Sequence, residues 1–266
     1  MLNKFKPKVL EKNLIRLGPR KDSGYVLHKN ILNNNSVFLL SLGVGFEIGF
    51  EKDIIKNFNK KNIILVDYSS SDKEFISTQL SLLLKFKLYR FTANLYRYFF
   101  FKKFIISNKK FINFLPFFVS DNNKGLNVKL SDLLEKNKKV FSKDLNIIKI
   151  DIERSEYLIL NENTIKQISI IFDVVLIEFH GLITFNEQIS KINELFKTHK
   201  YFIGHYHNNN TVPFHEKFEM NNCFEVTYLS SKKFKKEKIL NQEYPLKNID
   251  YSCNPKLKDV EFTFKN

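Results

Sequence analysis

Residues 37–49 read Val-Phe-Leu-Leu-Ser-Leu-Gly-Val-Gly-Phe-Glu-Ile-Gly, an apolar run that passes directly into a glycine-rich turn. A short apolar run bounded by glycine predicts a buried strand. Glycines at 43 and 45 allow a tight turn and let a ligand approach the backbone closely. From Phe50 to Phe58 apolar residues recur near the helical period, so a helix is expected to start near Phe50. The stretch therefore predicts a strand–turn–helix unit that can bind a ligand.

An acid ends the next expected strand, residues 62–66. Asp67 follows Gly43 by 24 residues, and a carboxylate there can accept hydrogen bonds from both ribose hydroxyls of a nucleoside cofactor. The glycines are spaced G-x-G-x-x-x-G, whereas the dinucleotide fingerprint is G-x-G-x-x-G, and Glu47 would repel a phosphate. The pattern favours a cofactor without phosphates and with a cationic sulfur. The alternative is a plain glycine turn with a helix-capping aspartate.

Five further strands are expected, separated by helix-like segments. This alternation predicts a mostly parallel sheet, whose ligands bind outside the carboxyl ends of the strands. The third to fifth strands, residues 114–119, 145–150 and 173–177, run into Asp121, Asp151 and Glu178 with His180. The last two lie near 201–204 and 224–228, and 189–196 keeps helical spacing before them. The prediction is an α/β, Rossmann-like fold with seven strands and helices on both faces.

Composition sets the class of protein. Hydrophobic residues make up 43% of the 266 and charged residues 27%, which allows a real core and argues against disorder. No apolar run is long enough to span a bilayer, and no signal peptide is recognised. The two cysteines, Cys223 and Cys253, have no diagnostic spacing, so a cytoplasmic location is expected. The formal charge of +15 points to an anionic partner or to biased composition.

One stretch departs from the alternation of strands and helices. Residues 75–120 contain no Asp or Glu, but eight Lys or Arg and fourteen Phe or Tyr. We take 1–266 as a single domain with an N-terminal extension, 1–36, and a basic, aromatic helical insertion, 72–113. Three interpretations stay open: a membrane-surface element at the inner face, a plain subdomain, and a nucleic-acid site. Nucleic acid ranks last, because no RNA-binding motif accompanies the stretch.

At this point the chain resembles the FkbM family of S-adenosylmethionine-dependent methyltransferases. The most distinctive segment is Lys149-Ile150-Asp151-Ile152-Glu153 with Ser155-Glu156. The resemblance covers almost the whole chain outside the insertion. It implies S-adenosyl-L-methionine as the cofactor and O-methylation of a hydroxyl on a sugar of a surface glycan or a related metabolite. The other matching segments are Leu17–Val26, Ser41–Gly45, Phe50-Glu51, Asp67, Leu130–Leu134, Ile177–His180, His205–Asn210, Phe224–Tyr228 and the tail 250–264.

Site residues follow from these strand ends and from the resemblance. The proposed catalytic group orients or deprotonates the acceptor hydroxyl, and histidine suits a base near neutral pH. No metal is assigned: His205 and His207 could share one with Glu178 or Asp151, but no third ligand has diagnostic spacing. The predicted residues are Asp151, His180 and His207 for catalysis, Gly43, Gly45, Asp67 and Asp121 for the cofactor, and Glu153, Arg154, Glu178 and His205 for the acceptor.

Four positions depart from the family pattern. Ser41 stands where many methyltransferases have an acid near the methionine amine, and Arg154 stands where a glycine follows Asp-x-Glu. Ser23 and Asn208 also replace glycines. Two alternatives therefore remain beside the enzyme: a non-catalytic, membrane-surface partner in glycan assembly that kept the fold, and a nicotinamide-dependent sugar enzyme. The dinucleotide glycine spacing, which this chain lacks, would mark the latter.

Overall fold

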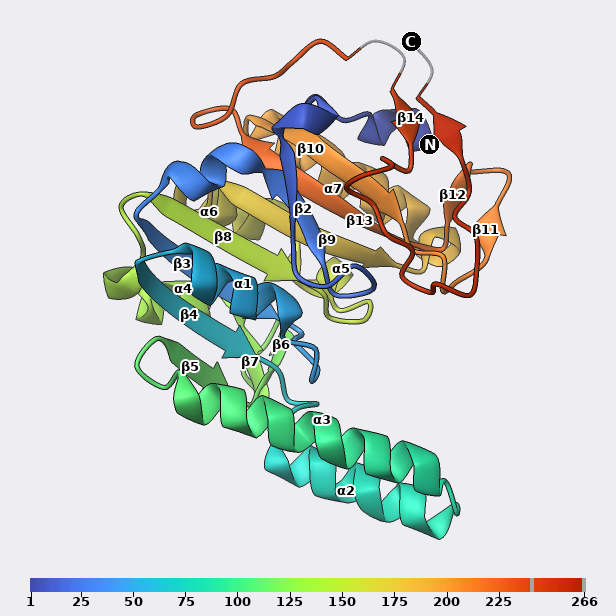
Figure 1. Cartoon of the computed structure of the whole chain (residues 1–266). Helices are drawn as coiled ribbons and strands as arrows, with labels where there is room; N and C mark the ends of the chain where they lie inside the picture. Colours follow the sequence, from blue (N-terminus) through green and yellow to red (C-terminus); the bar gives the residue numbers. More distant parts are fainter. Residues whose placement is uncertain (240–241, 265–266) are drawn as a thin grey trace.

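The structure is a computed structural model that describes residues 1–239 and 242–264. Its centre is a seven-stranded sheet in the order β10-β13-β9-β8-β3-β4-β5 (Figure 1). Six of these strands run in one direction, and β13 runs in the opposite direction between β10 and β9. The predicted mostly parallel α/β sheet is therefore confirmed. The strands are β3 (Ser36–Leu42), β4 (Lys60–Val66), β5 (Ile112–Leu115), β8 (Leu145–Ile150), β9 (Val174–His180), β10 (Tyr201–Asn208) and β13 (Cys223–Ser230).

Alternate residues of the strands face two separate apolar layers. One layer includes Phe38, Leu40 and Ile148 and is covered by the helices α4, α5, α6 and α7. The other includes Leu39 and Ile147 and is covered by α1 and by an N-terminal hairpin of β1 and β2. The sheet is thus buried on both faces, as parallel sheets require. The covering elements are α1 (Gly49–Asn57), α4 (Leu130–Lys136), α5 (Glu156–Ile159), α6 (Glu162–Ile171), α7 (Leu182–Thr198), β1 (Leu14–Leu17) and β2 (Tyr25–His28).

The third expected strand differs from the prediction. Residues 114–119 do not form one strand, because β5 ends at Leu115 and Pro116 follows. Proline has no N–H to donate to a neighbouring strand, which ends the ladder. The chain then forms a separate small parallel sheet of β6 (Phe118–Ser120) and β7 (Asn127–Lys129). Asp121 therefore lies beyond this small sheet and not at the edge of the main one.

Short elements complete the described part of the chain. The N-terminal segment carries the 3-10 turns η1 (Leu2–Phe5), η2 (Glu11–Asn13) and η3 (Lys29–Asn33), and η4 (Lys138–Val140) follows α4. Two small antiparallel pairs, β11 (Phe214–His215) with β12 (Met220–Asn221) and β14 (Glu243–Tyr244) with β15 (Phe262–Thr263), lie near the β10 edge. The C-terminal tail thus returns to the same end of the molecule as the N-terminus (Figure 1).

The basic, aromatic stretch forms a helical hairpin of α2 (Asp72–Leu84) and α3 (Leu88–Ser107). Figure 1 shows the hairpin projecting away from the sheet. Phe75 stacks on Tyr98 with ring centroids 3.8 Å apart, and Phe46 of the glycine-rich turn packs against both rings. The hairpin is therefore anchored at its base on the turn. Within the described residues, no helix has the length and apolar character needed to cross a bilayer.

Candidate active site

Strand register places four polar residues, from or directly after four strands, in one row that ends at the glycine-rich turn after β3. Glu225 of β13 lies opposite both Glu178 of β9 and His207 of β10. Asp151 directly follows Ile150, the partner of both Ile177 and Leu42, and so stands between Glu178 and Gly43. The row brings the predicted cofactor turn beside the predicted acceptor residues.

The glycine-rich turn passes tightly over the end of β8. Gly43 has a φ of +72°, and a Cβ built on it would lie 1.6 Å from the carbonyl oxygen of Asp151. The buried amine of Lys149 donates to the Gly43 carbonyl at 2.8 Å. Gly45 also has a positive φ, +56°, but a Cβ there would meet nothing within 4 Å. Position 43 thus needs glycine for packing, whereas Gly45 borders open space that a ligand can use.

Asp67 holds this turn in shape. Its Oδ2 accepts hydrogen bonds from the backbone N–H groups of Val44, at 3.0 Å, and of Gly45. Its Oδ1 accepts from the N–H and hydroxyl of Ser69, both at 2.7 Å, and Ser70 donates to Oδ2 at 3.1 Å. A carboxylate has about four lone-pair sites. To bind Asp67, the hydroxyls of a ribose would therefore have to replace hydrogen-bond donors of the turn. The predicted contact between Asp67 and the ribose stays a prediction.

A buried acid lies behind the turn. The Ser41 hydroxyl donates to Oε1 of Glu51 at 2.8 Å, and Glu51 is fully buried. The second oxygen, Oε2, has no hydrogen-bond partner among the described residues. Glu51 in α1 thus places a buried carboxylate beside Ser41. The sequence shows Glu51 next to the buried face formed by Phe50 and Ile54, and the pair Phe50-Glu51 belongs to the segments that resemble the family.

His180 lies among carboxylates. Its Nδ1 is 3.1 Å from Oε1 of buried Glu156, which also accepts the backbone N–H of His180 at 2.9 Å. Its Nε2 lies 3.7–4.0 Å from carboxylate oxygens of Glu153, Asp151 and Glu178. Burial alone lowers the pKa of His180, but the bond to Glu156 and the nearby carboxylates outweigh burial and raise the pKa to about 9. His180 therefore carries its proton at neutral pH and is a poor base there.

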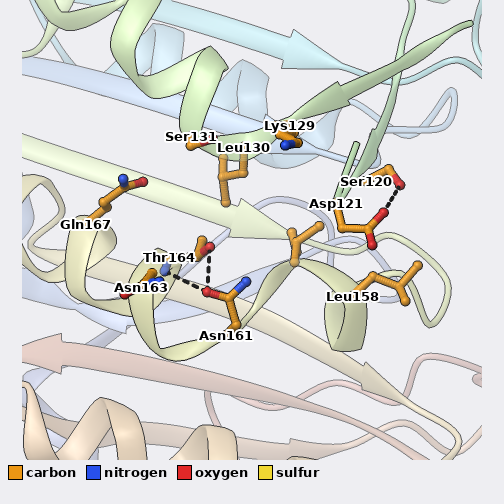
Figure 2. Close-up of a pocket in the computed structure, with 11 residues that line it drawn as sticks. Ser120, Asp121, Lys129, Leu130, Ser131, Leu158, Asn161, Asn163, Thr164 and Gln167 are labelled. Atoms are coloured by element: carbon orange, nitrogen blue, oxygen red, sulfur yellow. Dashed lines mark hydrogen bonds between the residues drawn. The ribbon is translucent and has the colours of Figure 1, made fainter. Parts of the chain in front are cut away.

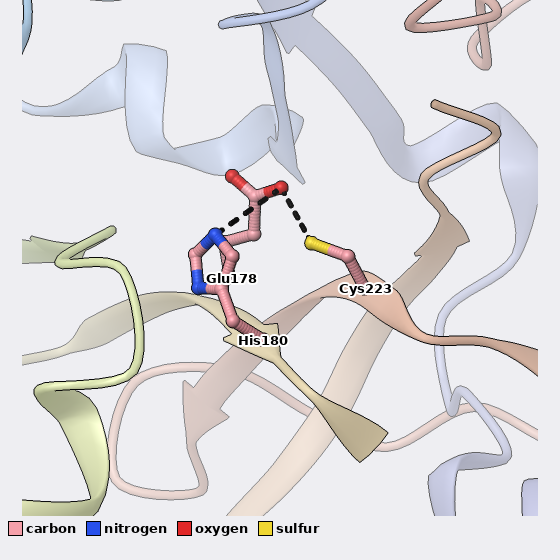
Figure 3. Close-up of side chains that lie close together, drawn as sticks. All are labelled: Glu178, His180 and Cys223. Atoms are coloured by element: carbon pink, nitrogen blue, oxygen red, sulfur yellow. Dashed lines mark hydrogen bonds and ion pairs between the residues drawn. The ribbon is translucent and has the colours of Figure 1, made fainter. Parts of the chain in front are cut away.

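Glu178 is the neighbouring group that titrates near neutrality. Burial and the charge of Asp151 raise its pKa to about 7, against the opposing effects of His180, Cys223 and Asn209. Its Oε1 accepts from Asn209 Nδ2 at 2.8 Å and from the Cys223 thiol at 2.9 Å. Figure 3 shows Glu178, His180 and Cys223 pointing toward one another from β9 and β13. A general base works best with a pKa near the working pH, so Glu178 suits that role better than His180.

Asp151 joins the turn to the His180 cluster. Tyr25 of β2 donates to its Oδ2 at 3.2 Å, and the Lys149 amine lies 3.6 Å from the same oxygen. Burial lowers the pKa of Lys149, but Asp151, Glu51 and Glu178 outweigh it and raise the pKa, so the amine stays charged. A quarter of the Asp151 side chain remains exposed. Asp151 can therefore reach a bound acceptor, and Tyr25 is a site residue that sequence analysis did not single out.

Comparison with protein families identifies the family to which the residues of this site belong. The profile of the methyltransferase FkbM domain matches residues 100–231, which include Asp151, Glu178 and His180. Residues 100–231 are an FkbM methyltransferase domain. The resemblance noted from the sequence is thereby confirmed, and the nicotinamide alternative is set aside. S-adenosylmethionine is the methyl donor of this FkbM protein.

Solved structures similar to the FkbM chain are also methyltransferases. A precorrin-6y C5,15-methyltransferase from Geobacter metallireducens is 12% identical, with a TM-score of 0.36 over 75% of this chain and 83% of that one. An O-methyltransferase from Bacillus cereus in complex with SAH is 9% identical, with a TM-score of 0.39 over 76% of each chain. No curated protein matches the chain in sequence.

The residues around the turn fit the cofactor. S-adenosylmethionine carries a cationic sulfonium and an ammonium group, and the unpartnered Oε2 of Glu51 is a buried acceptor beside the turn. The open space next to Gly45 lets a ligand approach the backbone. A cavity of about 530 Å³ lies next to the turn, between Glu47 and the hairpin residues Tyr96 and Arg97. Gly43, Gly45 and Asp67 stay the predicted cofactor residues, and Glu51 is a further candidate.

The segment after Asp151 has an unusual backbone. Glu153 and Arg154 both have positive φ, 51° and 77°. A non-glycine residue in this conformation costs about 1–2 kcal/mol, which explains why the family pattern has glycine at position 154. Arg154 nevertheless keeps the turn and adds an exposed cation at the rim of the FkbM site. The strained pair directs the Glu153 carboxylate to within 3.7 Å of His180.

The structure does not bring His205 and His207 to the acceptor residues. Both side chains are only 2% exposed, and His205 Nε2 lies 2.9 Å from Oδ1 of Asp250 in the C-terminal tail. His207 faces Glu225 and Cys253, in a cluster separate from Glu178, His180 and Cys223. Burial lowers the pKa of His207. The reason is strand order: β10 is an edge strand, separated from β9 by β13 and covered by the tail.

Asp121 also lies apart from the turn. It lines a different cavity, of about 300 Å³, with Lys129, Leu158 and Asn161 (Figure 2). There its carboxylate accepts hydrogen bonds from Ser120 and Asn122, which lower its pKa. Because β5 ends early at Leu115, Asp121 follows a strand of the small sheet and not of the main one, and its predicted contact with the cofactor stays a prediction.

Proposed function

We propose that this FkbM methyltransferase methylates a hydroxyl on a sugar of a surface glycan or a related metabolite. The observation that carries the proposal is the position of Asp151. Its partly exposed carboxylate stands between the cofactor turn and the pair of Glu178 and His180. A hydroxyl placed there has two carboxylates within reach to orient it and to take its proton.

The chemistry of these residues fits hydroxyl activation. The bound cofactor supplies an electrophilic methyl group. Asp151, held by Tyr25 and Lys149, orients the hydroxyl, and the O–H proton passes to a carboxylate, with Glu178 best matched to neutral pH. His180 keeps its proton and balances part of the negative charge. Most of the rate gain in such a site comes from alignment of the reacting groups.

The charge of the site restricts the acceptor. Asp151, Glu153 and Glu178 all approach His180 within 4.0 Å, so an anionic group at the reacting position would be repelled. Any negative charge of the acceptor belongs at the rim, near exposed Arg154. The site thus favours a hydroxyl on an uncharged part of the sugar, with any acidic substituent of the acceptor held away from the reacting position.

The proposed function is tested with purified full-length protein. We expect calorimetry to show binding of S-adenosylmethionine, and a panel of nucleotide sugars and short glycans to yield S-adenosylhomocysteine together with an O-methylated product identified by NMR. Binding of the cofactor without product across the panel would favour the non-catalytic partner in glycan assembly. Transfer to carbon or nitrogen would contradict the O-methylation proposal.

We also propose that the helical hairpin docks on an anionic membrane surface from the cytoplasmic side. At its tip, Leu84, Phe86 and Tyr89 are 80–87% exposed. The same tip carries Lys85 and Lys87, and no acid occurs from residue 75 to 120. Apolar side chains flanked by cations match an interface of acyl chains and anionic headgroups, and each cation there contributes about 1 kcal/mol. Docking would bring the site to a lipid-linked acceptor.

This proposal predicts salt-sensitive binding to vesicles. Sedimentation should show binding to vesicles that contain phosphatidylglycerol, and salt should weaken it. Leu84→Ser with Phe86→Ser should lower the partition coefficient by about tenfold or more, since each apolar side chain buried in the interface is worth more than about 1 kcal/mol. Ile170→Ser, at a side chain of α6 that is 71% exposed, is the matched control and should bind normally. Binding that ignores lipid charge would contradict the proposal.

A further inference from the structure

Buried polar atoms without partners gather where the C-terminal tail covers β10. Within residues 1–239 and 242–264, they include both ring nitrogens of His207, Nδ2 of Asn208 and Oδ1 of Asp259. A buried polar group left without a partner costs about 1–3 kcal/mol. The methyl-transfer site described above uses none of these atoms. The concentration of such groups at one place points to a ligand that satisfies them.

Three metal-binding side chains converge at this place. His207 of β10, Glu225 of β13 and Cys253 of the tail each offer one donor atom, and these atoms lie within 4.8 Å of one another. All three are at least nine-tenths buried. His207 Nδ1 is 3.9 Å from Glu225 Oε2, which is too long for a hydrogen bond. Two zinc–ligand bonds of about 2.1 Å each can bridge that distance.

The other acid–histidine–cysteine cluster, Glu178, His180 and Cys223, does not have partnerless ligand atoms of this kind. There Glu178 accepts hydrogen bonds from Asn209 and Cys223, and His180 contacts Glu156 (Figure 3). Potential metal ligands of this cluster already form contacts with other protein groups. His207, by contrast, is 2% exposed, and neither of its ring nitrogens has a hydrogen bond to any described residue, so its ring is free to ligate a cation.

We propose that His207, Glu225 and Cys253 bind a zinc ion that fastens the C-terminal tail to β10 and β13. A set of imidazole, carboxylate and thiolate is typical of Zn²⁺, whereas Mg²⁺ and Ca²⁺ prefer oxygen ligands throughout. A nearby cation that could compete is Arg16; its Nε and Nη2 donate to the carbonyls of Pro19 and Lys21, while its buried Nη1 has no hydrogen-bond partner among the described residues. The ion would balance the Glu225 carboxylate and hold Cys253 as a thiolate.

Metal content tests the site directly. Full-length protein, purified without a metal-affinity tag, should contain about one zinc per chain by mass spectrometry. Cys253→Ser and His207→Gln should each lower the affinity for zinc about tenfold or more, the usual order for loss of a ligand's support, and the zinc content should fall with it. Cys223→Ser is the matched control, a buried cysteine of the other cluster, and should keep its zinc. Cobalt in place of zinc should give a thiolate-to-metal absorption band that Cys253→Ser lacks.

Two further measurements separate ligand loss from misfolding. Circular dichroism should show that the variants keep their sheet and helices, and Cys253→His, which restores a zinc ligand, should recover the metal. A chelator should lower the melting temperature of the wild-type protein, and zinc should restore it. The proposal is overturned if the wild-type protein neither contains nor takes up zinc, if Cys253→Ser retains it, or if Cys223→Ser loses it equally. None of these readouts depends on methyl transfer.

Discussion

Replacement of Asp151 by asparagine is expected to lower the turnover of methyl transfer by about 10²-fold or more, the effect of losing a positioned proton acceptor. Asparagine keeps the size of the side chain but removes the charge that faces Tyr25, Lys149 and the acceptor. The affinity for S-adenosylmethionine should change little, because the turn that holds the cofactor is intact. Turnover is measured as S-adenosylhomocysteine released with an identified acceptor.

The control for Asp151 lies at the opposite edge of the same sheet. Asp173 precedes β9, and its carboxylate accepts the backbone N–H of Asn146 at 2.9 Å, far from the cofactor turn. Asp173→Asn should therefore leave turnover within about a factor of two, as expected for a site away from the chemistry. Equal losses in both variants, or unchanged turnover in folded Asp151→Asn, would remove Asp151 from the mechanism.

Gly43→Ala is expected to destabilise the protein by about 2–5 kcal/mol. A left-handed backbone costs a non-glycine residue about 1–2 kcal/mol, and overpacking adds about 1–3 kcal/mol. The overpacking here is severe, because the new Cβ would be placed 1.6 Å from the Asp151 carbonyl oxygen. Either the turn or the end of β8 must move, so cofactor affinity should fall as well. Denaturant unfolding and calorimetry measure the two effects.

Gly45→Ala provides the matched comparison two residues away. Gly45 has a similar positive φ, but a Cβ there would meet no atom within 4 Å. It should therefore cost only the backbone term, about 1–2 kcal/mol. Equal destabilisation by the two substitutions would show that the contact between the turn and β8 is less tight than the structure describes.

Most of the fold could be predicted from local pattern. Mostly apolar runs at 37–42 and 145–150 predicted the central strands, because strands buried on both faces are rich in apolar residues; Asn146 and Lys149 are the polar members of the second run. The third strand was mispredicted, since Pro116 interrupts a run that is apolar on both sides. Periodicity cannot detect such an interruption, because proline ends the ladder through its missing N–H while its side chain is compatible with the apolar pattern.

The candidate site was predictable only in part. Acids at the ends of successive strands indicated Asp151 and Glu178, because parallel strands end at one edge. The supporting residues Glu51 and Tyr25 come from α1 and the N-terminal hairpin, and no spacing in the sequence links them to that edge, whereas Glu156 follows Asp151 by five residues. His207 lies in the same row as Asp151, but two strands separate them, and the tail covers His207.

The sequence by itself determined that this is an α/β protein with a glycine-rich turn and a row of acids, because strand burial and chain direction follow from local composition. Only the tertiary structure decided which of these groups meet. Cross-strand register placed Glu225 between Glu178 and His207, and the returning tail brought Cys253 to His207. Contacts of this kind join segments far apart in the chain, and the pKa values of Glu178 and His180 depend on them because burial and neighbouring charge act through space.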